Sequence, residues 1–135
     1  MKVLIINGPN LNLLGTREPE IYGTISMETY METLQSEFPG YELKYYQSNI
    51  EGELINILQQ DDFDAVVINP GAFTHYSYAI ADCLKNIRKP KVEVHISNIY
   101  KREEFRQKSV TAANTDAVLS GFGMDGYRLA ILSLK

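Results

Sequence analysis

The sequence is poor in residues that cross-link small proteins or bind metals, with one cysteine and two histidines in 135 residues. The lone Cys83 cannot form an internal disulfide, which excludes a disulfide-stapled secreted scaffold. His75 and His95 belong to no HExxH or HxH pattern, and no cysteine cluster accompanies them. We therefore expect neither a bound metal nor a metal-dependent reaction.

Long apolar runs are also missing from the chain. No run approaches the ~18 residues that a membrane-spanning helix needs, so we expect no membrane association. The first run, from Val3 to Ile6, is broken by Asn7, Gly8 and Pro9, too early for the core of a signal peptide. These features predict a cytoplasmic protein that begins with a buried strand.

The chain has no excess of basic residues. Its 13 Lys and Arg against 17 Asp and Glu give a net charge of −4, which argues against a nucleic-acid partner. Residues 85–108 depart from this average, because they carry eight basic and three acidic groups, a net charge of +5. Composition favours a solvated basic face for this stretch, and contact with an anion is the alternative.

Strand-like and helix-like segments alternate along the chain, and the length fits a single domain spanning residues 1–135. Strands are expected at 3–6, 41–45, 65–68, 92–96 and 117–119, and helices at 27–38, 50–58, 76–87, 102–108 and 127–134. Ser26 is the expected N-cap of the first helix, and the strand at 41–45 alternates as an edge strand does. The alternation predicts an α/β fold, a flavodoxin-like doubly wound sheet of five parallel strands in the order 2-1-3-4-5.

Polar loops follow three of the predicted strands. In this strand order the switch point lies between strands 1 and 3, where ligands bind beyond the carboxyl ends. Residues 7–10 (Asn-Gly-Pro-Asn) then face residues 69–72 (Asn-Pro-Gly-Ala), with residues 95–97 beside them. The candidate site is therefore expected at this edge.

Both histidines fall at that edge, after strands 3 and 4. Each could be structural, but the shared location favours catalysis, and imidazole suits proton transfer near neutrality. The backbone amides of Ile96 and Ser97 open the loop after strand 4 and could bind a carboxylate. A plain strand-ending serine is the alternative for Ser97.

The loop from Pro9 to Gly23 is long for a strand-to-helix connection, which usually takes ~2–6 residues. A long loop at the ligand edge is often a lid. It carries Arg17 and Tyr22, and a guanidinium near a phenol favours the phenolate. Tyr22 is therefore a candidate base.

A glycine pattern near the C-terminus, Gly121-x-Gly123-x-x-Gly126, matches the dinucleotide fingerprint G-x-G-x-x-G. That fingerprint needs a following βαβ unit, and too little chain remains after Gly126 for one. The pattern indicates a strand-to-helix turn, and we expect no cofactor.

Several motifs, in order and across most of the chain, resemble those of type II 3-dehydroquinate dehydratases. They are residues 7–15 (NGPNLNLLG), 17–19 (REP), 22–23 (YG), 49–52 (NIEG), 69–75 (NPGAFTH) with Asp82, 93–98 (EVHISN), 102–106 (REEFR) and 126–127 (GY). The chain departs from the family pattern at Gln107 and Lys108, where histidine is common, and at Asp116. The resemblance implies a metal-free hydro-lyase that converts 3-dehydroquinate to 3-dehydroshikimate, in the shikimate pathway or in quinate breakdown.

The resemblance also implies roles in proton transfer. Tyr22 would take the C2 proton and form an enolate, with Arg17 favouring its phenolate. His95 would protonate the leaving C1 hydroxyl, and Glu93 would orient His95. Asn10 would hold the water that stabilises the enolate.

Substrate contacts are implied as well. Asn69, His75 and Arg106 would hold the substrate together with the amides of Ile96 and Ser97. Family members form trimers assembled into dodecamers, in which the residue matching Asp82 reaches the site of a neighbouring subunit. Asp82 read alone is an exposed helix acid.

Two flavodoxin-like alternatives come from another class, that of non-catalytic binding modules. A receiver domain needs acids after strand 1 and a phosphorylatable aspartate after strand 3, where this chain has Asn7-Gly8 and Asn69-Pro70. A flavodoxin that binds FMN needs a Ser/Thr-rich loop after strand 1, which Gly-Pro-Asn-Leu-Asn-Leu does not provide.

Overall fold

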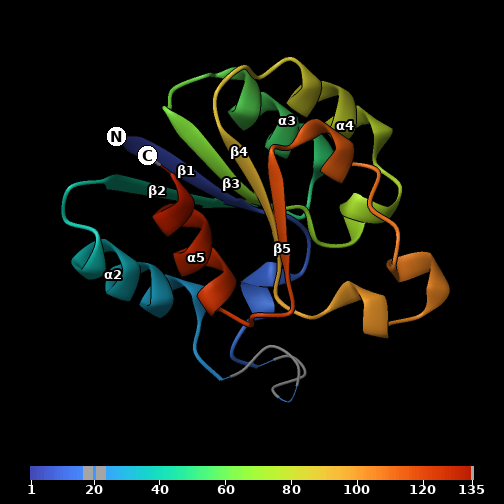
Figure 1. Ribbon diagram of the computed structural model, residues 1–135, viewed down its shortest axis with the longest axis horizontal. Coiled ribbons are helices and arrows are strands. Elements are labelled where there is room, and N and C mark those ends of the chain that lie inside the picture. The colour runs from blue at the N-terminus through green and yellow to red at the C-terminus, as the bar shows by residue number, and fades with distance from the viewer. Residues whose placement is uncertain (17–19, 21–23, 135) are drawn as a thin grey trace.

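The computed structural model describes residues 1–16, 20 and 24–134. Five parallel strands form one sheet in the order β2-β1-β3-β4-β5, as predicted (Figure 1). The strands are β1 (Lys2–Asn7), β2 (Glu42–Gln47), β3 (Ala65–Asn69), β4 (Lys91–His95) and β5 (Ala117–Ser120).

Burial separates the central strands from the edges of the sheet. All five residues of β3 and all five of β4 are buried, as expected for central strands of a sheet covered on both faces, although β4 carries Lys91, Glu93 and His95. In β2, exposed and half-buried positions alternate at its start, which confirms the predicted edge strand. β5 forms the opposite edge and is partly exposed.

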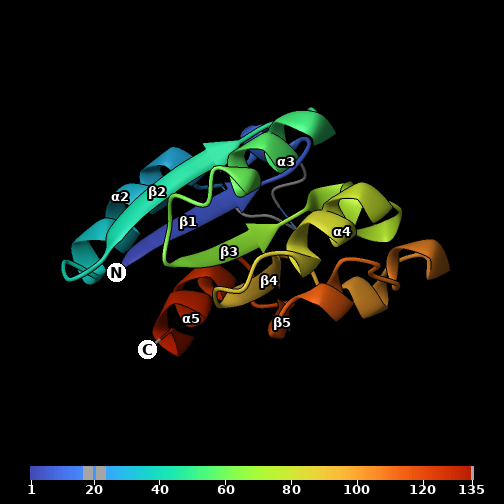
Figure 2. The ribbon, with the colours of Figure 1, turned by 90° about the horizontal axis from the view of Figure 1, so that it is seen from above.

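Helices cover both faces of the sheet. Figure 2 shows α2 (Met27–Glu37) and α5 (Asp125–Ser133) on one face, and α3 (Glu51–Gln59) and α4 (Tyr78–Lys85) on the other. Successive side chains of a strand point to opposite faces. Val3 and Ile5 accordingly pack in the core beneath α2 and α5, whereas Leu4 and Ile6 pack in the core beneath α3 and α4.

Serine caps set two of the helix starts. The side chain of Ser26 accepts a hydrogen bond from the Thr29 amide and confirms the predicted cap of α2. Ser77 accepts from the Ile80 amide, so α4 begins at Tyr78. Tyr76, predicted inside that helix, lies before it and is exposed, because Gly71–His75 form a separate 3-10 helix.

The helix predicted over residues 102–108 is not formed. This range contains one 3-10 helix, Glu104–Arg106. A second, Ile99–Lys101, precedes the range, and Arg102 between the two has extended backbone. Phe105 is exposed, so the segment buries no apolar face that could offset the cost of nucleating a longer helix.

The glycine pattern after β5 forms a strand-to-helix turn. Gly121 and Gly123 have positive φ angles of 94° and 61°, a conformation that side chains disfavour. A Cβ on Gly126 would lie 2.9 Å from Cγ1 of Val94, so this glycine lets α5 pack closely on β4. Across the described part of the chain, no helix is both long and apolar enough to cross a membrane.

The loops after β1 and β3 meet at Gly8. Its amide donates to the Asn69 carbonyl at 2.8 Å, and a Cβ at Gly8 would lie 2.2 Å from the Pro70 carbonyl oxygen. The two loops can approach this closely only because Gly8 has no side chain.

Replacing Gly8 with alanine should therefore push these loops apart and destabilise the fold by at least about 2 kcal/mol. Gly52→Ala in α3 is the matched control, because a Cβ there meets no described atom within 4 Å. The control should stabilise by up to about 1 kcal/mol. Urea unfolding measures both, and equal midpoints for Gly8→Ala and the unchanged protein would contradict the close approach.

Candidate functional site

A cleft of about 240 Å³ lies at the carboxyl edge of the sheet. Its walls come from the loops that follow β1, β3 and β4, as the switch point predicted. The cleft brings together seven of the predicted site residues: Asn10, Asn69, His75, His95, Ile96, Ser97 and Arg106.

Asn10 is held by its backbone. It adopts the left-handed conformation, with φ of 68°, and its amide donates to Oδ1 of Asn49 at 2.9 Å. The Gln47 side chain donates both to that oxygen, at 3.0 Å, and to the Gly8 carbonyl, at 3.1 Å. This network explains why Asn49 belongs to a motif although it does not line the cleft.

A second network fixes Asn69 from below the cleft. Asn69 and Asn7 are register partners at the ends of β3 and β1. The Tyr127 hydroxyl accepts from Nδ2 of Asn69 at 2.9 Å and donates to Oδ1 of Asn7 at 2.8 Å. Burial raises the pKa of Tyr127, so the group stays a neutral hydroxyl that can donate.

Glu93 and His95 form a buried pair at the end of β4. Oε2 of Glu93 lies 2.7 Å from Nε2 of His95, and the two side chains are 0% and 6% exposed. Three hydroxyls surround the same carboxylate, those of Thr74, Ser109 and Thr111. The contact from Glu93 uses Nε2 of His95 and holds the ring in one orientation. Nδ1 is therefore the ring nitrogen left for another partner.

The environment of Glu93 favours its ionised form. Burial acts to raise the pKa of this carboxyl, but the hydrogen bond and charge of His95 and the hydroxyls of Thr111 and Ser109 outweigh burial and lower it. The pKa of Glu93 in the folded protein lies below its ordinary value of 4.5, so ionisation of this carboxyl stabilises the fold above about pH 4.5. That stabilisation is lost as the pH falls through the folded-state pKa.

His75 and Arg106 lie on the opposite wall of the cleft. Nδ1 of His75 is 2.7 Å from the carbonyl oxygen of Lys108, and Nε of Arg106 pairs with Glu103 at 3.0 Å. The Arg106 guanidinium also lies 5.3 Å from the centre of the Phe105 ring. This wall presents imidazole and guanidinium groups to the cleft.

The basic stretch thus divides into groups with different tasks. Arg102 and Arg106 line the cleft. Lys91 is buried and donates to the carbonyls of Leu84 and Ile87 at the end of α4. The solvated face that composition favoured was therefore a wrong prediction for Lys91, whereas the predicted site residue Arg106 does line the cleft.

Four predicted residues do not appear in the lining of the cleft. Glu93 is buried behind His95 and does not itself line it. Arg17 and Tyr22 lie outside the described residues, as does part of the predicted lid. Asp82 is exposed on α4 and does not line the cleft.

Other residues at the site were missed by the sequence analysis. Arg102, Phe105 and Tyr76 line the cleft, and three hydroxyls surround Glu93. Arg102 and Phe105 carried a signal, because they lie in one of the quoted motifs. Ser109 and Thr111 carried none, since their role depends on the path of a loop.

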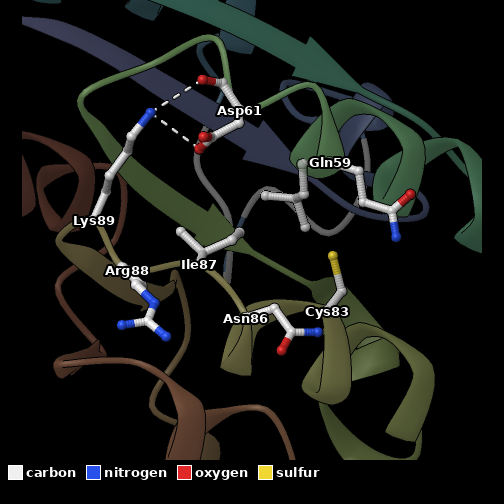
Figure 3. A pocket seen from close by; sticks show the side chains of 8 residues that line it. Gln59, Asp61, Cys83, Asn86, Ile87, Arg88 and Lys89 are labelled. Carbon is white, nitrogen blue, oxygen red and sulfur yellow. Dashed lines mark hydrogen bonds and ion pairs between the residues drawn. The ribbon is translucent and has the colours of Figure 1, made fainter.

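A larger hollow of about 370 Å³ lies at the opposite edge of the sheet (Figure 3). It is formed where α3 and α4 end, before β3 and β4 begin, and Cys83 lines it. Nζ of Lys89 there is 3.0 Å from Oδ1 of Asp61, an ion pair that Figure 3 draws. Burial raises the pKa of the Cys83 thiol, which keeps it protonated and unreactive near neutrality.

Within the described ranges, no group of three or more His, Cys, Asp or Glu side chains is placed to hold a metal ion. The groups that can act at the carboxyl-edge cleft are an imidazole held by an ionised carboxylate, two arginines, a second imidazole and amides. Such a set suits proton transfer on an anionic or hydroxylated small molecule.

Comparison with known proteins gives a consistent result along the whole chain. The profile of the family described as Dehydroquinase class II matches residues 1–135. The 3-dehydroquinate dehydratase of Carboxydothermus hydrogenoformans is 54% identical, over 99% of this chain and 90% of that protein. The 3-dehydroquinate dehydratase of Thermotoga maritima is 53% identical, over 100% and 95%.

Solved structures agree with these sequence matches. The type II dehydroquinase from Butyrivibrio crossotus superposes with a TM-score of 0.93 at 47% identity, over 97% of this chain and 94% of that one. A 3-dehydroquinate dehydratase-like protein from Bifidobacterium longum is more distant, with a TM-score of 0.69 at 30% identity, over 98% and 94%.

Removing the Tyr127 hydroxyl should destabilise the protein, because it leaves buried groups of Asn7 and Asn69 without their partner. We expect Tyr127→Phe to cost roughly 1–3 kcal/mol in unfolding free energy. Tyr30→Phe is the control: its buried hydroxyl makes no hydrogen bond to another described residue. The control should be neutral or slightly stabilising in the same urea titration, and equal losses in both variants would contradict the network.

Proposed function

The chain belongs to the dehydroquinase class II family, and from this premise we propose that it dehydrates 3-dehydroquinate to 3-dehydroshikimate through an enolate, with Tyr22 as base and His95 as acid. Membership makes the protein a hydro-lyase, which removes the receiver and flavodoxin alternatives. The buried Glu93–His95 pair, whose imidazole lines the cleft, is the observation that carries the mechanism.

The acid half of the reaction would use His95. Loss of water requires a proton on the leaving C1 hydroxyl, and an imidazolium supplies one near neutral pH. Ionised Glu93 accepts from Nε2–H of His95, which leaves the Nδ1 side of the ring to reach the substrate. Glu93 thus orients His95 and offsets its positive charge.

The base half of the reaction would use Tyr22, with Arg17 favouring its phenolate by charge. Removing the C2 proton places negative charge on the ketone oxygen. A water held by Asn10 would stabilise that oxygen. Hydrogen-bond donors already in place where charge develops are worth several kcal/mol, on the order of 3 for a single donor.

Substrate binding would use the remaining polar groups of the cleft. The amides of Ile96 and Ser97 would hold the carboxylate. His75, Asn69 and Arg106 would hold hydroxyl groups. Arg102 lines the same cleft, and the two guanidinium groups suit an anionic substrate.

Asp82 requires a second subunit in this scheme. It is exposed on α4, outside the cleft of its own chain. We place it in the active site of a neighbouring subunit of a trimer, with trimers assembled into a dodecamer.

The first test is the appearance of enone absorbance when 3-dehydroquinate is added to metal-free protein. Tyr22→Phe should lower kcat by at least ~100-fold, the scale of a general base. Tyr41→Phe makes the same chemical change at a hydroxyl that donates to the Leu134 carbonyl, away from the cleft, and should leave kcat unchanged. Folded protein that produces no enone would refute the function, and normal turnover by Tyr22→Phe would refute the role of Tyr22.

Complementation between subunits tests the role of Asp82. Asp82→Asn and Tyr22→Phe should each be slow as pure proteins. Refolded as an equal mixture, they should regain activity, because about one site in four would pair an intact Tyr22 with an intact Asp82 from its neighbour. A mixture no more active than its components would place Asp82 outside the neighbouring site, and light scattering reports the assembly.

A further inference from the structure

Glu93 has an unusual environment for a carboxylate. Its side chain is 0% exposed, so water cannot solvate it and other donors must do so. His95 supplies one donor, two residues along the same strand. Three hydroxyls lie beside the carboxylate as well, those of Thr74, Ser109 and Thr111, which come from the loops after β3 and before β5.

Each hydroxyl has a single proton, which limits how the donors can be shared. The Thr74 oxygen lies 3.2 Å from the carboxylate but 2.6 Å from Ser109 and 2.7 Å from Thr111. Thr74 is therefore best placed to donate to one of these two hydroxyls. They in turn donate to the carboxylate, Ser109 at 2.9 Å from Oε2 and Thr111 to Oε1.

The two carboxylate oxygens then have separate tasks. Oε2 accepts hydrogen bonds from Nε2 of His95 and from the Ser109 hydroxyl, whereas Oε1 accepts one from the Thr111 hydroxyl. Rotation of the carboxylate away from His95 would break the bond from Thr111. The hydroxyls therefore fix both the ionised state and the orientation of the group that holds His95.

We infer that Ser109 and Thr111 are positioning residues for proton donation: they hold the Glu93 carboxylate ionised and aligned on Nε2 of His95. The inference rests on the proposed role of His95 as the acid. It adds two residues to the machinery that touch neither the cleft nor the substrate and that act through Glu93.

The loop that carries these hydroxyls also holds the opposite wall of the cleft. The Val110 amide donates to the Thr74 carbonyl at 2.7 Å, and the Lys108 carbonyl lies 2.7 Å from Nδ1 of His75. One short segment between β4 and β5 thus joins the support of the acid to a substrate contact (Figure 1). A separate readout for each is needed to tell them apart.

Thr111→Val is the decisive variant, because valine keeps the shape of threonine and has a methyl group in place of the hydroxyl. We expect kcat to fall about ten-fold or more with KM changed less than about two-fold, the pattern of a group that supports the reacting residue. Thr111→Ser restores the hydroxyl and should recover most of kcat. Thr115→Val is the control, because its hydroxyl donates to the Ala112 carbonyl at 2.9 Å on the same segment.

A double-mutant cycle shows whether Thr111 acts through Glu93. In a Glu93→Gln background, Thr111→Val should have little further effect on kcat. Unchanged kcat in Thr111→Val, a matching rise in KM, no recovery in Thr111→Ser, or additive losses in the cycle would each overturn the inference.

A second variant and the activity of the unchanged protein separate the possible outcomes. If Thr111→Val does not fold, Ser109→Ala is judged by the same split between kcat and KM. If the unchanged protein forms no enone from 3-dehydroquinate, the proposed function fails, whereas an active protein with an unaffected Thr111→Val refutes the positioning role alone.

Discussion

The edge of the sheet that carries the cleft is organised around one buried negative charge. An ionised carboxylate removed from water is stable only where donors replace its solvation, and an unpaired buried charge costs several kcal/mol, roughly 3–5. Glu93 meets this requirement with the ring of His95 and a cluster of three hydroxyls, in which Ser109 and Thr111 donate to the carboxylate and Thr74 donates to one of these two. Two of those hydroxyls lie on the loop before β5 and one on the segment after β3, so the charge brings together segments that are distant in the sequence.

The segment after β3 also meets the loop after β1, at the ends of these two strands. There the constraint is steric and polar: Gly8 allows the close approach, and Tyr127 bridges Asn7 and Asn69. Because α5 carries Tyr127, a helix of the protein core sets the orientation of an amide that lines the cleft. The stability of the fold and the geometry of the site are therefore linked through shared hydrogen bonds.

Local pattern predicted most of the fold. The apolar runs of β1 and β3, the alternating apolar residues of β4 and the serine cap of α2 are short-range sequence signals. The helix expected over residues 102–108 failed because its helical propensity had no apolar face to bury. Charge counting also misjudged Lys91, because it cannot tell that this side chain is buried and donates to the carbonyls of Leu84 and Ile87. Arg106 was identified by its motif and not by the charge of the stretch.

By itself, the sequence determined the alternation of strands and helices, the strand order, the edge at which ligands bind and the family to which the chain belongs. Those features depend on periodicity and on motifs that are contiguous in the chain. Only the tertiary structure decided how Glu93 is compensated, which residues hold Asn69, and that Ser109 and Thr111 belong beside the acid. These contacts join residues that are 16 to 58 positions apart, and no local pattern encodes which distant hydroxyl a folded loop brings to a buried charge.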